Sequence, residues 1–204
     1  MGIYRDQILP RAIDVVMGGR EFAAIRGRVC ADLDGEVLEV GFGSGRNVPC
    51  YPAAVTRVLA VDPATAGRKL AASRLAASRV PVEFIGLDGQ SLPVGADAVD
   101  HVLVTWTLCT IPDVRLALAE IRRVLRPGGA LHFAEHGLSP EPGVARWQHR
   151  LTPWQRRLAG GCHLDRPIGE LIGESGLALT RLKTYYLTGP RPLGYLFEGT
   201  ARKA

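Results

Sequence analysis

The chain has 204 residues, of which 47% are apolar and 22% are charged, and its formal net charge is +5. These proportions are ordinary for a folded globular protein, and the length suits one domain with a substantial core. The longest apolar-leaning stretch, at about 102–111, is far shorter than the ~20 residues that a membrane-spanning helix needs, which argues against stable membrane insertion.

The basic residues are scattered along the sequence, so solvated helix faces explain them better than a nucleic-acid partner does. The cysteines stand far apart in the sequence, without a C-x-x-C pair, at Cys30, Cys50, Cys109 and Cys162. Scattered thiols of this kind are typical of a reducing cytoplasm, and we expect the protein to be located there. We also expect it to be a monomer or a homodimer.

The N-terminal 35 residues predict a helical extension. Ile8, Leu9, Ala12, Ile13 and Val16 follow helical spacing, and the next helix covers about 20–33.

Short apolar runs then alternate with helical segments. Strands are predicted at about 36–40, 57–61, 81–86, 98–104 and 130–135, with a short helix near 46–51 and longer ones at 65–78 and 113–125. This alternation predicts an α/β fold with a doubly wound, mostly parallel sheet. After a loop, helices are expected at 144–158, despite Pro153, and at 166–175, with Asp165 as the N-cap. Two closing strands at 177–187 and 193–203 complete a seven-stranded sheet.

The most informative motif joins the first predicted strand to a glycine-rich turn. Glu39 ends the apolar run 37–40, and Gly41, Gly43 and Gly45 follow at alternate positions. Such a turn leaves bare backbone against which a cofactor can lie. Twenty-one residues after Gly41, the second predicted strand ends in Asp62, where a carboxylate can accept hydrogen bonds from a ribose diol. The pair predicts an adenosine-type cofactor.

The spacing of the glycines separates the candidate cofactors. A dinucleotide fingerprint needs glycine at its sixth position, which is Arg46 here, and Glu39 suits an amino-bearing ligand better than a pyrophosphate. This turn resembles motif I of the class I S-adenosylmethionine-dependent methyltransferases, in which the acidic residue and the glycines hold the methionine end of the cofactor. A plain glycine-rich turn and a nicotinamide site remain alternatives.

The resemblance continues at the next two strand ends. Asp88 and Gly89 fill the places that receive the adenine ring in this family, and the segment from Thr105 to Asp113 resembles motif IV. The resemblance therefore implies S-adenosyl-L-methionine as the cofactor and a Rossmann-like methyltransferase fold. The cofactor-binding residues that it implies are Glu39, Gly41, Gly43, Gly45, Asp62, Pro63, Asp88, Gly89 and Thr105.

A narrower resemblance covers nearly the whole chain. The segments 8–11, 45–49, 108–111 and 161–164 are similar to methyltransferases of the methyltransferase-11 type and to animal alkyl-thiol methyltransferases. The animal proteins carry an N-terminal membrane anchor, which we do not find in residues 1–6. The chain is thus expected to form one domain with four parts: a helical cap (1–35), a cofactor-binding core (36–136), an acceptor-side insertion (137–176) and closing strands (177–204).

Methyl transfer to a thiol requires loss of the thiol proton, which an imidazole near neutral pKa can accept. His136 directly follows the fifth predicted strand, and His163 stands beside Cys162, so both are candidates for a base or an orienting group. Either histidine could equally be a satisfied loop residue. Side chains that could line the acceptor pocket, although the aromatic ones also suit a core, are Tyr4, Asn47, Trp106, Cys109 and Trp147.

The types of Cys109, His136, Cys162 and His163 would permit a zinc site, but their spacing gives it no support, so no metal is expected. The sequence also lacks the run after the fourth strand that marks nucleic-acid amino methylation, since Thr105–Leu108 stands there. We therefore expect methyl transfer to a small-molecule acceptor, with sulfur favoured over nitrogen or oxygen. The alternatives are a lipid, quinone or natural-product acceptor, a non-catalytic cofactor-binding protein, and a nicotinamide oxidoreductase.

Overall fold

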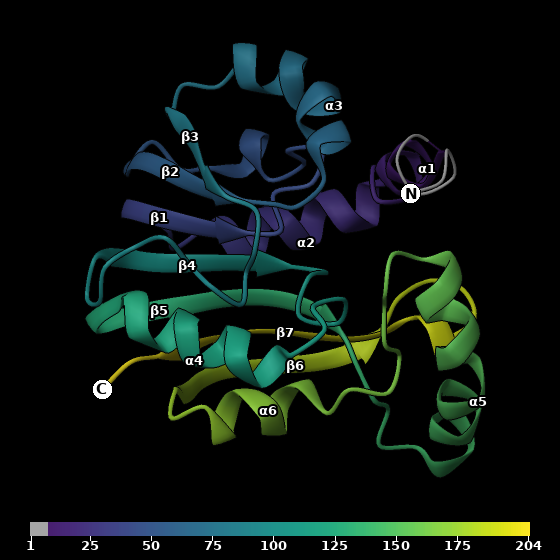
Figure 1. The fold of residues 1–204 in the computed structure, drawn as a ribbon. Coiled ribbons are helices and arrows are strands. Elements are labelled where there is room, and N and C mark those ends of the chain that lie inside the picture. Colours follow the sequence, from purple (N-terminus) through teal and green to yellow (C-terminus); the bar gives the residue numbers. More distant parts are fainter. Residues whose placement is uncertain (1–7) are drawn as a thin grey trace.

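The computed structural model describes residues 8–204 and shows a seven-stranded sheet with helices on both faces (Figure 1). The strand order is β3-β2-β1-β4-β5-β7-β6, and all neighbouring strands are parallel except those that pair with β7. This arrangement confirms the expected α/β, mostly parallel, doubly wound sheet. The strands are β1 (Gly35–Val40), β2 (Val55–Val61), β3 (Val82–Gly86), β4 (Val99–Thr105), β5 (Leu125–His136), β6 (Ala178–Tyr186) and β7 (Tyr195–Arg202).

The two faces of the sheet are buried under different helices. Leu38, Val40 and Val102 pack against α4 (Val114–Val124) and α6 (Ile168–Glu174). Val37 and Leu103 belong to the opposite face, under α2 (Arg20–Cys30), and α3 (Thr65–Ala76) covers the same face near β2. Because both faces of the central strands are buried, β1 and β4 have nearly continuous apolar runs instead of alternating ones.

The connections between strands depart from the sequence prediction at two places. Between β1 and β2 the chain forms only one 3-10 turn, η2 (Val48–Cys50), because Pro49 and Pro52 prevent a longer helix. Between β3 and β4 no helix forms among residues 87–98, so strand and helix do not alternate throughout.

The segment after β5 carries α5 (Pro142–Leu158), which continues through Pro153 as expected. The N-cap predicted at Asp165 is wrong. The helix α6 begins at Ile168, since Arg166 precedes Pro167 and a residue before proline disfavours the helical conformation. Asp165 instead pairs with His149 Nδ1 at 3.0 Å. A 3-10 turn, η3 (Arg191–Leu193), connects β6 to β7.

None of the helices within residues 8–204 combines the length and apolar character needed to cross a bilayer.

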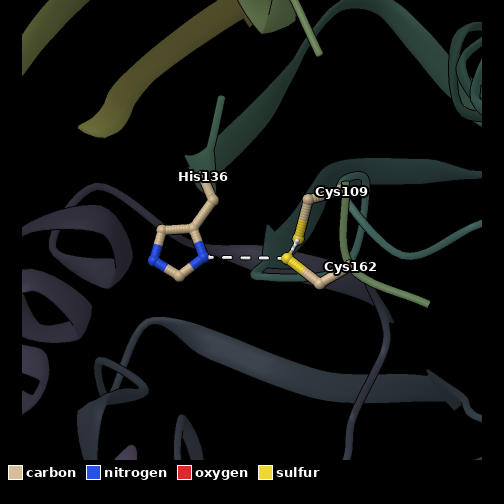
Figure 2. A group of neighbouring side chains, drawn as sticks. All are labelled: Cys109, His136 and Cys162. Carbon is tan, nitrogen blue, oxygen red and sulfur yellow. Dashed lines mark hydrogen bonds between the residues drawn. The ribbon is translucent and has the colours of Figure 1, made fainter. Parts of the chain in front are cut away.

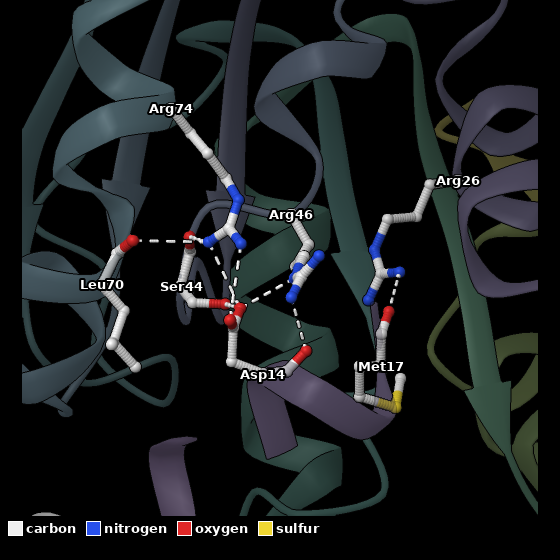
Figure 3. A network of polar contacts seen from close by, with 7 residues as sticks. All are labelled: Asp14, Met17, Arg26, Ser44, Arg46, Leu70 and Arg74. Carbon is white, nitrogen blue, oxygen red and sulfur yellow. Dashed lines mark hydrogen bonds and ion pairs between the residues drawn. The ribbon is translucent and has the colours of Figure 1, made fainter. Parts of the chain in front are cut away.

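The first helix, α1 (Leu9–Val16), has no buried residue and is held to the core by polar contacts at Asp14 and at its C-cap, where Arg26 Nη1 donates to the Met17 carbonyl oxygen at 2.8 Å (Figure 3). Asp14 accepts hydrogen bonds from Ser44 Oγ (2.5 Å) and Arg46 Nε (2.7 Å), and Arg74 Nη1 lies 3.2 Å from the same oxygen (Figure 3). Arg46 Nη2 also donates to the Asp14 carbonyl oxygen at 2.6 Å. Burial alone would raise the pKa of Asp14, but these hydrogen bonds lower it to about 2.

We expect replacement of Asp14 by Asn to release α1 while the rest of the fold persists. A lowered carboxyl pKa stabilises the folded state above the unfolded pKa near 4, and this contribution is lost as the pH falls from about 4 towards 2. Because the side chain is partly hydrated, the loss in the free energy of unfolding at pH 7 should be only about 1 kcal/mol. Hydrogen exchange should accelerate in residues 9–16.

The matched control is Asp97→Asn, because Asp97 forms an ion pair with Lys203 far from α1. Unchanged exchange protection of α1 in Asp14→Asn would contradict the anchoring role of Asp14.

Candidate active site

A cavity of about 910 Å³ lies at the carboxyl ends of β1, β2, β3 and β4. This is the edge at which open parallel sheets bind their ligands, and the volume is that of a typical small-molecule site. Its walls are the loops after these four strands, together with α1 and the turn that follows α5. Leu9 Cδ2 lies 3.8 Å from the position that a Cβ on Gly160 would occupy, so α1 and this turn meet over the cavity.

The glycine-rich turn after β1 presents bare backbone to this cavity. Gly41 has φ +83°, and a Cβ there would lie 1.9 Å from Thr107 Oγ1, so no larger residue fits. Gly43 has φ +55° and open space at its Cβ position, and it lines the cavity. Gly45 does not line the cavity; it packs against Phe42 and Ala71 and supports the turn.

Glu39 lies beneath the turn and is only 1% exposed. Its carboxylate accepts hydrogen bonds from Tyr51 OH and from Asn47 Nδ2, the latter at 3.0 Å. Burial raises the pKa of Glu39 to about 7, although both hydrogen bonds oppose the shift. Asn47 Nδ2 also donates to Thr105 Oγ1 at 3.0 Å, whereas Asn47 Oδ1 is buried without a partner within residues 8–204. Asn47 and Thr105 line the cavity, so this acceptor is available to a ligand that carries N–H groups.

Asp62, at the end of β2, fixes the turn from the other side. Its Oδ2 accepts from the Gly43 N–H and its Oδ1 from the Ala64 N–H, both at 2.6 Å. Burial raises the pKa of this carboxyl, and the two backbone donors oppose that effect. Asp62 and Pro63 both line the cavity, and each carboxylate oxygen keeps a lone pair for a ligand hydroxyl.

The loop after β3 completes this end of the cavity. Asp88 Oδ1 accepts from the Gln90 N–H at 2.8 Å, which shapes the loop. Gly89 is buried, and a Cβ there would lie 2.8 Å from Val40 Cγ1, so the loop can approach β1 only with glycine at this position. Both residues line the cavity beside the exposed side chain of Leu87.

The loop after β4 is held by Glu135, which the sequence analysis did not single out. This fully buried carboxylate of β5 accepts from the N–H groups of Thr107 (2.7 Å), Leu108 (3.0 Å) and Cys109 (3.1 Å). Burial raises the pKa of Glu135 to about 7, although the three donors oppose the shift. A glutamate within an otherwise buried apolar strand is the signal that could have identified it.

Arg26 is the second residue that the sequence analysis missed. It is 5% exposed and lines the cavity, with its guanidinium carbon 4.8 Å from the ring centre of Trp106. Burial lowers its pKa to about 10, and its Nε has no partner among the described residues. The backbone of Trp106 has φ +51°, a strained conformation of the kind that concentrates at functional sites. Its buried Nε1 also has no hydrogen-bond partner among the described residues. An arginine on the apolar side of α2, next to Ile25, was the available signal.

The two candidate histidines lie behind this wall, not on it. His136 Nδ1 faces Cys162 Sγ at 4.0 Å, and Cys162 Sγ lies 3.7 Å from Cys109 Sγ (Figure 2). His163 Nδ1 lies 3.1 Å from the Cys109 carbonyl oxygen, and burial lowers the pKa of His163. Sharing of one proton between the two thiols lowers the pKa of Cys162 and, together with burial, raises that of Cys109.

Cys109 and Trp147, two of the other expected pocket residues, do not line this cavity. Tyr4 lies outside the described residues. Trp147 is 55% exposed and lines a different cavity of about 710 Å³ between α5 and η3.

The steric role of Gly41 predicts that Gly41→Ala lowers the free energy of unfolding by roughly 2–4 kcal/mol, because the new Cβ combines an unfavourable positive φ with a collision with Thr107. Gly43→Ala is the matched control, since it introduces a positive φ into open space and should cost only about 1 kcal/mol. Denaturant unfolding measures both, and equal losses would contradict the close approach of Gly41 to Thr107.

Comparisons with known proteins agree with this geometry. The family described as "Methyltransferase domain" matches residues 38–133. Human thiol S-methyltransferase TMT1A is 31% identical over 92% of this chain and 75% of its own length. Rat thiol S-methyltransferase TMT1B is 37% identical over 64% of this chain, but this match spans only 54% of the rat protein. The structure of geranyl diphosphate methyltransferase in complex with S-adenosylmethionine superposes with a TM-score of 0.70 at 13% identity, covering 89% of this chain and 84% of the other.

The match to the human relative covers most of both sequences, and the sheet and its ligand edge agree with the same family. The chain belongs to the class I S-adenosylmethionine-dependent methyltransferases, of the methyltransferase-11 type.

Proposed function

We propose that this enzyme transfers the methyl group of S-adenosylmethionine to a small thiol. The observation that carries the proposal is the composition of the cavity beyond the donor loops. Its walls there carry many apolar or small residues, from α1, the loop after β4 and the turn after α5: Leu9, Ile13, Met17, Trp106, Ile111, Ala159, Gly160 and Gly161. The polar and charged residues that line the cavity from the same region are Asp14, Thr107, Thr110 and Arg156. An apolar wall suits an alkyl thiol, and the likeness to TMT1A and TMT1B, which are thiol S-methyltransferases, points to the same acceptor class.

The lining groups also suit the donor. We assign the donor's ammonium to the unpartnered Asn47 Oδ1, which Glu39 and Thr105 position, and the donor's carboxylate to Arg26. The backbone of Gly41 and Gly43 lies under the methionine chain, and Asp62 accepts from the ribose diol. Pro63, Asp88 and Gly89 surround the adenine, whereas Gly45 acts only by shaping the turn.

Methyl transfer is a direct displacement between the two substrates, so the protein need not form a covalent bond with either of them. The acceptor sulfur forms a bond to the methyl carbon while the donor sulfur takes the electron pair of the bond that breaks, and the thiol proton leaves before the transfer. Correct positioning supplies much of the rate, and exclusion of water by α1 and the turn at 159–161 favours the dispersal of the sulfonium charge.

Neither candidate base lines the cavity, so His163, the better placed of the two, would act on the thiol through a bridging water. Its Nδ1 faces a carbonyl oxygen and therefore carries the proton, which leaves Nε2 as the acceptor. His136 directs Nδ1 at Cys162, and its ring lies 6.5 Å from that of Trp106, so we assign it an orienting role.

The ribose role of Asp62 is tested by Asp62→Ala and the more conservative Asp62→Asn. Each variant should weaken S-adenosylhomocysteine binding by about 1–3 kcal/mol in calorimetry, because the diol loses a charged acceptor. Glu83→Ala, an exposed acidic residue on β3, serves as the control. Unchanged affinity in folded Asp62→Asn would refute the assignment.

The proposed acceptor is tested by turnover of radiolabelled donor with matched alkyl thiols, amines and phenols. We expect methylation of the thiols alone. His163→Ala should lower kcat by about 100-fold, the usual scale for loss of a general base, with little change in donor affinity. His149→Ala is the control, since His149 is exposed on α5. Turnover of phenols or amines but not thiols would overturn the proposal.

A further inference from the structure

Three soft ligand atoms converge behind the acceptor wall. The Sγ atoms of Cys109 and Cys162 and Nδ1 of His136 all lie within 4.8 Å of one another (Figure 2). In a tetrahedral zinc site the ligand atoms are separated by about 3.8 Å for two sulfurs and about 3.6 Å for sulfur and nitrogen. The observed separations are 3.7 Å between the two sulfurs and 4.0 Å between Cys162 Sγ and His136 Nδ1. Two of the three separations are therefore close to those of a coordination tetrahedron, and the third, between Cys109 Sγ and His136 Nδ1, is at most 4.8 Å.

The backbone around these ligands is held independently of any ion. The Cys109 N–H donates to Glu135, and the Cys109 carbonyl accepts from the His163 N–H at 2.8 Å, which joins the loop after β4 to the turn after α5. His136 ends β5 and pairs with Leu196 of β7. A site whose ligands are fixed by separate elements of the fold requires little reorganisation to bind a cation.

The charges around the cluster also suit a divalent cation. Two thiolates and a neutral imidazole would neutralise the charge of Zn²⁺, and the buried carboxylate of Glu135 is balanced by the buried guanidinium of Arg166. Arg166 Nη1 donates to the Leu108 carbonyl oxygen, and the side chain of Gln155 hydrogen-bonds to Cys162. Such second contacts orient thiolate ligands and stabilise their charge.

We propose that Cys109, Cys162 and His136 bind a zinc-class divalent cation and leave its fourth coordination position to an exogenous thiolate. Among residues 8–204, no further His, Cys, Asp or Glu places a ligand atom within the same spacing. Three protein ligands with an open position are the arrangement of catalytic zinc sites, whereas structural sites use four. The expectation of no metal rested on sequence spacing, which cannot show that loops after β4, β5 and α5 meet.

The open position gives the site a chemical role. A thiol that coordinates zinc gives up its proton, through water, to the acceptor nitrogen of His163 and remains a nucleophilic thiolate at neutral pH. The residues next to the ligands, Thr110 and Gly161, line the cavity, so the cluster lies directly behind the acceptor end. The metal site itself stands on the ligand geometry, and only the identity of the fourth ligand rests on the proposed thiol acceptor.

Metal binding is tested on the whole protein, reduced with a non-thiol reductant. We expect one equivalent of Zn²⁺, and Co²⁺ should give tetrahedral ligand-field bands with thiolate-to-cobalt charge transfer. Removal of any one proposed ligand should lower Zn²⁺ affinity by at least about 100-fold, which is tested by Cys109→Ser, Cys162→Ser and His136→Ala. This loss is larger than the one expected when a residue that only hydrogen-bonds a ligand is removed. Cys50→Ser is the control, since Cys50 lies outside the cluster and is half-buried.

Thermal melting identifies any variant that fails to fold, and Cys162→Ala then replaces the serine variant. Absence of the cobalt charge-transfer band in the wild-type protein, or metal affinity unchanged in folded Cys162→Ser and Cys162→Ala, overturns the metal site. Formation of a Cys109–Cys162 disulfide without measurable metal binding, detected by mass, overturns it as well.

The fourth position is tested by adding an alkyl thiol to the cobalt-loaded protein. An intensified charge-transfer band supports thiolate coordination, and an unchanged spectrum overturns this part alone. Thiol methylation should fall at least 10-fold when a chelator removes the metal and recover with Zn²⁺. Full thiol turnover by metal-free protein would overturn the metal's role and leave the proposed function intact. Metal binding without any thiol turnover would overturn the proposed thiol acceptor and leave the metal site intact.

Discussion

The carboxylate of Glu135 is the interaction on which the site most depends. It is fully buried at the end of β5 and accepts three successive backbone N–H groups, which no apolar residue could satisfy. The loop that it holds places Thr107 against Gly41 and Cys109 beside Cys162. One strand end therefore fixes both the glycine-rich turn after β1 and the contact between Cys109 and Cys162, so these two regions cannot be repositioned independently.

A second carboxylate acts on the opposite wall under different physical conditions. Asp14 pairs with Arg46 and Arg74 where water still reaches, and α1 adds no buried residue of its own. Partly hydrated ion pairs are weak, whereas a buried carboxylate with three donors is costly to disrupt. The cavity thus has one rigid wall, set by the sheet, and one wall that can open at small cost. This asymmetry suits an enzyme that must admit two substrates and exclude water during transfer.

The sequence predicted the elements that depend on local pattern. Apolar runs predicted the strands, and the glycine spacing with Asp62 predicted a ligand site at the edge of the sheet where the cavity lies, because parallel strands bring their carboxyl ends together. Contacts between distant segments could not be predicted in this way. Nothing in the spacing of Glu135, Arg26 or Asp14 reveals their partners, and Cys109 meets Cys162 across 53 positions of sequence. The prolines at 49 and 52 also limit the short helix expected near 46–51 to a single 3-10 turn.

The two ends of the cavity are built from different kinds of element, and this difference bears on which acceptor the enzyme takes. The donor end consists of strand ends and their first loop residues, whose positions follow from the sheet register. The end that we propose for the acceptor consists of α1 and the turn after α5, which lie outside the sheet and meet where Leu9 lies against Gly160. Changes there leave the core undisturbed, so acceptor choice can diverge while donor binding persists. The sulfur cluster is the exception, since its ligands come from the sheet edge itself, and a cation held there would tie the acceptor end to sulfur chemistry.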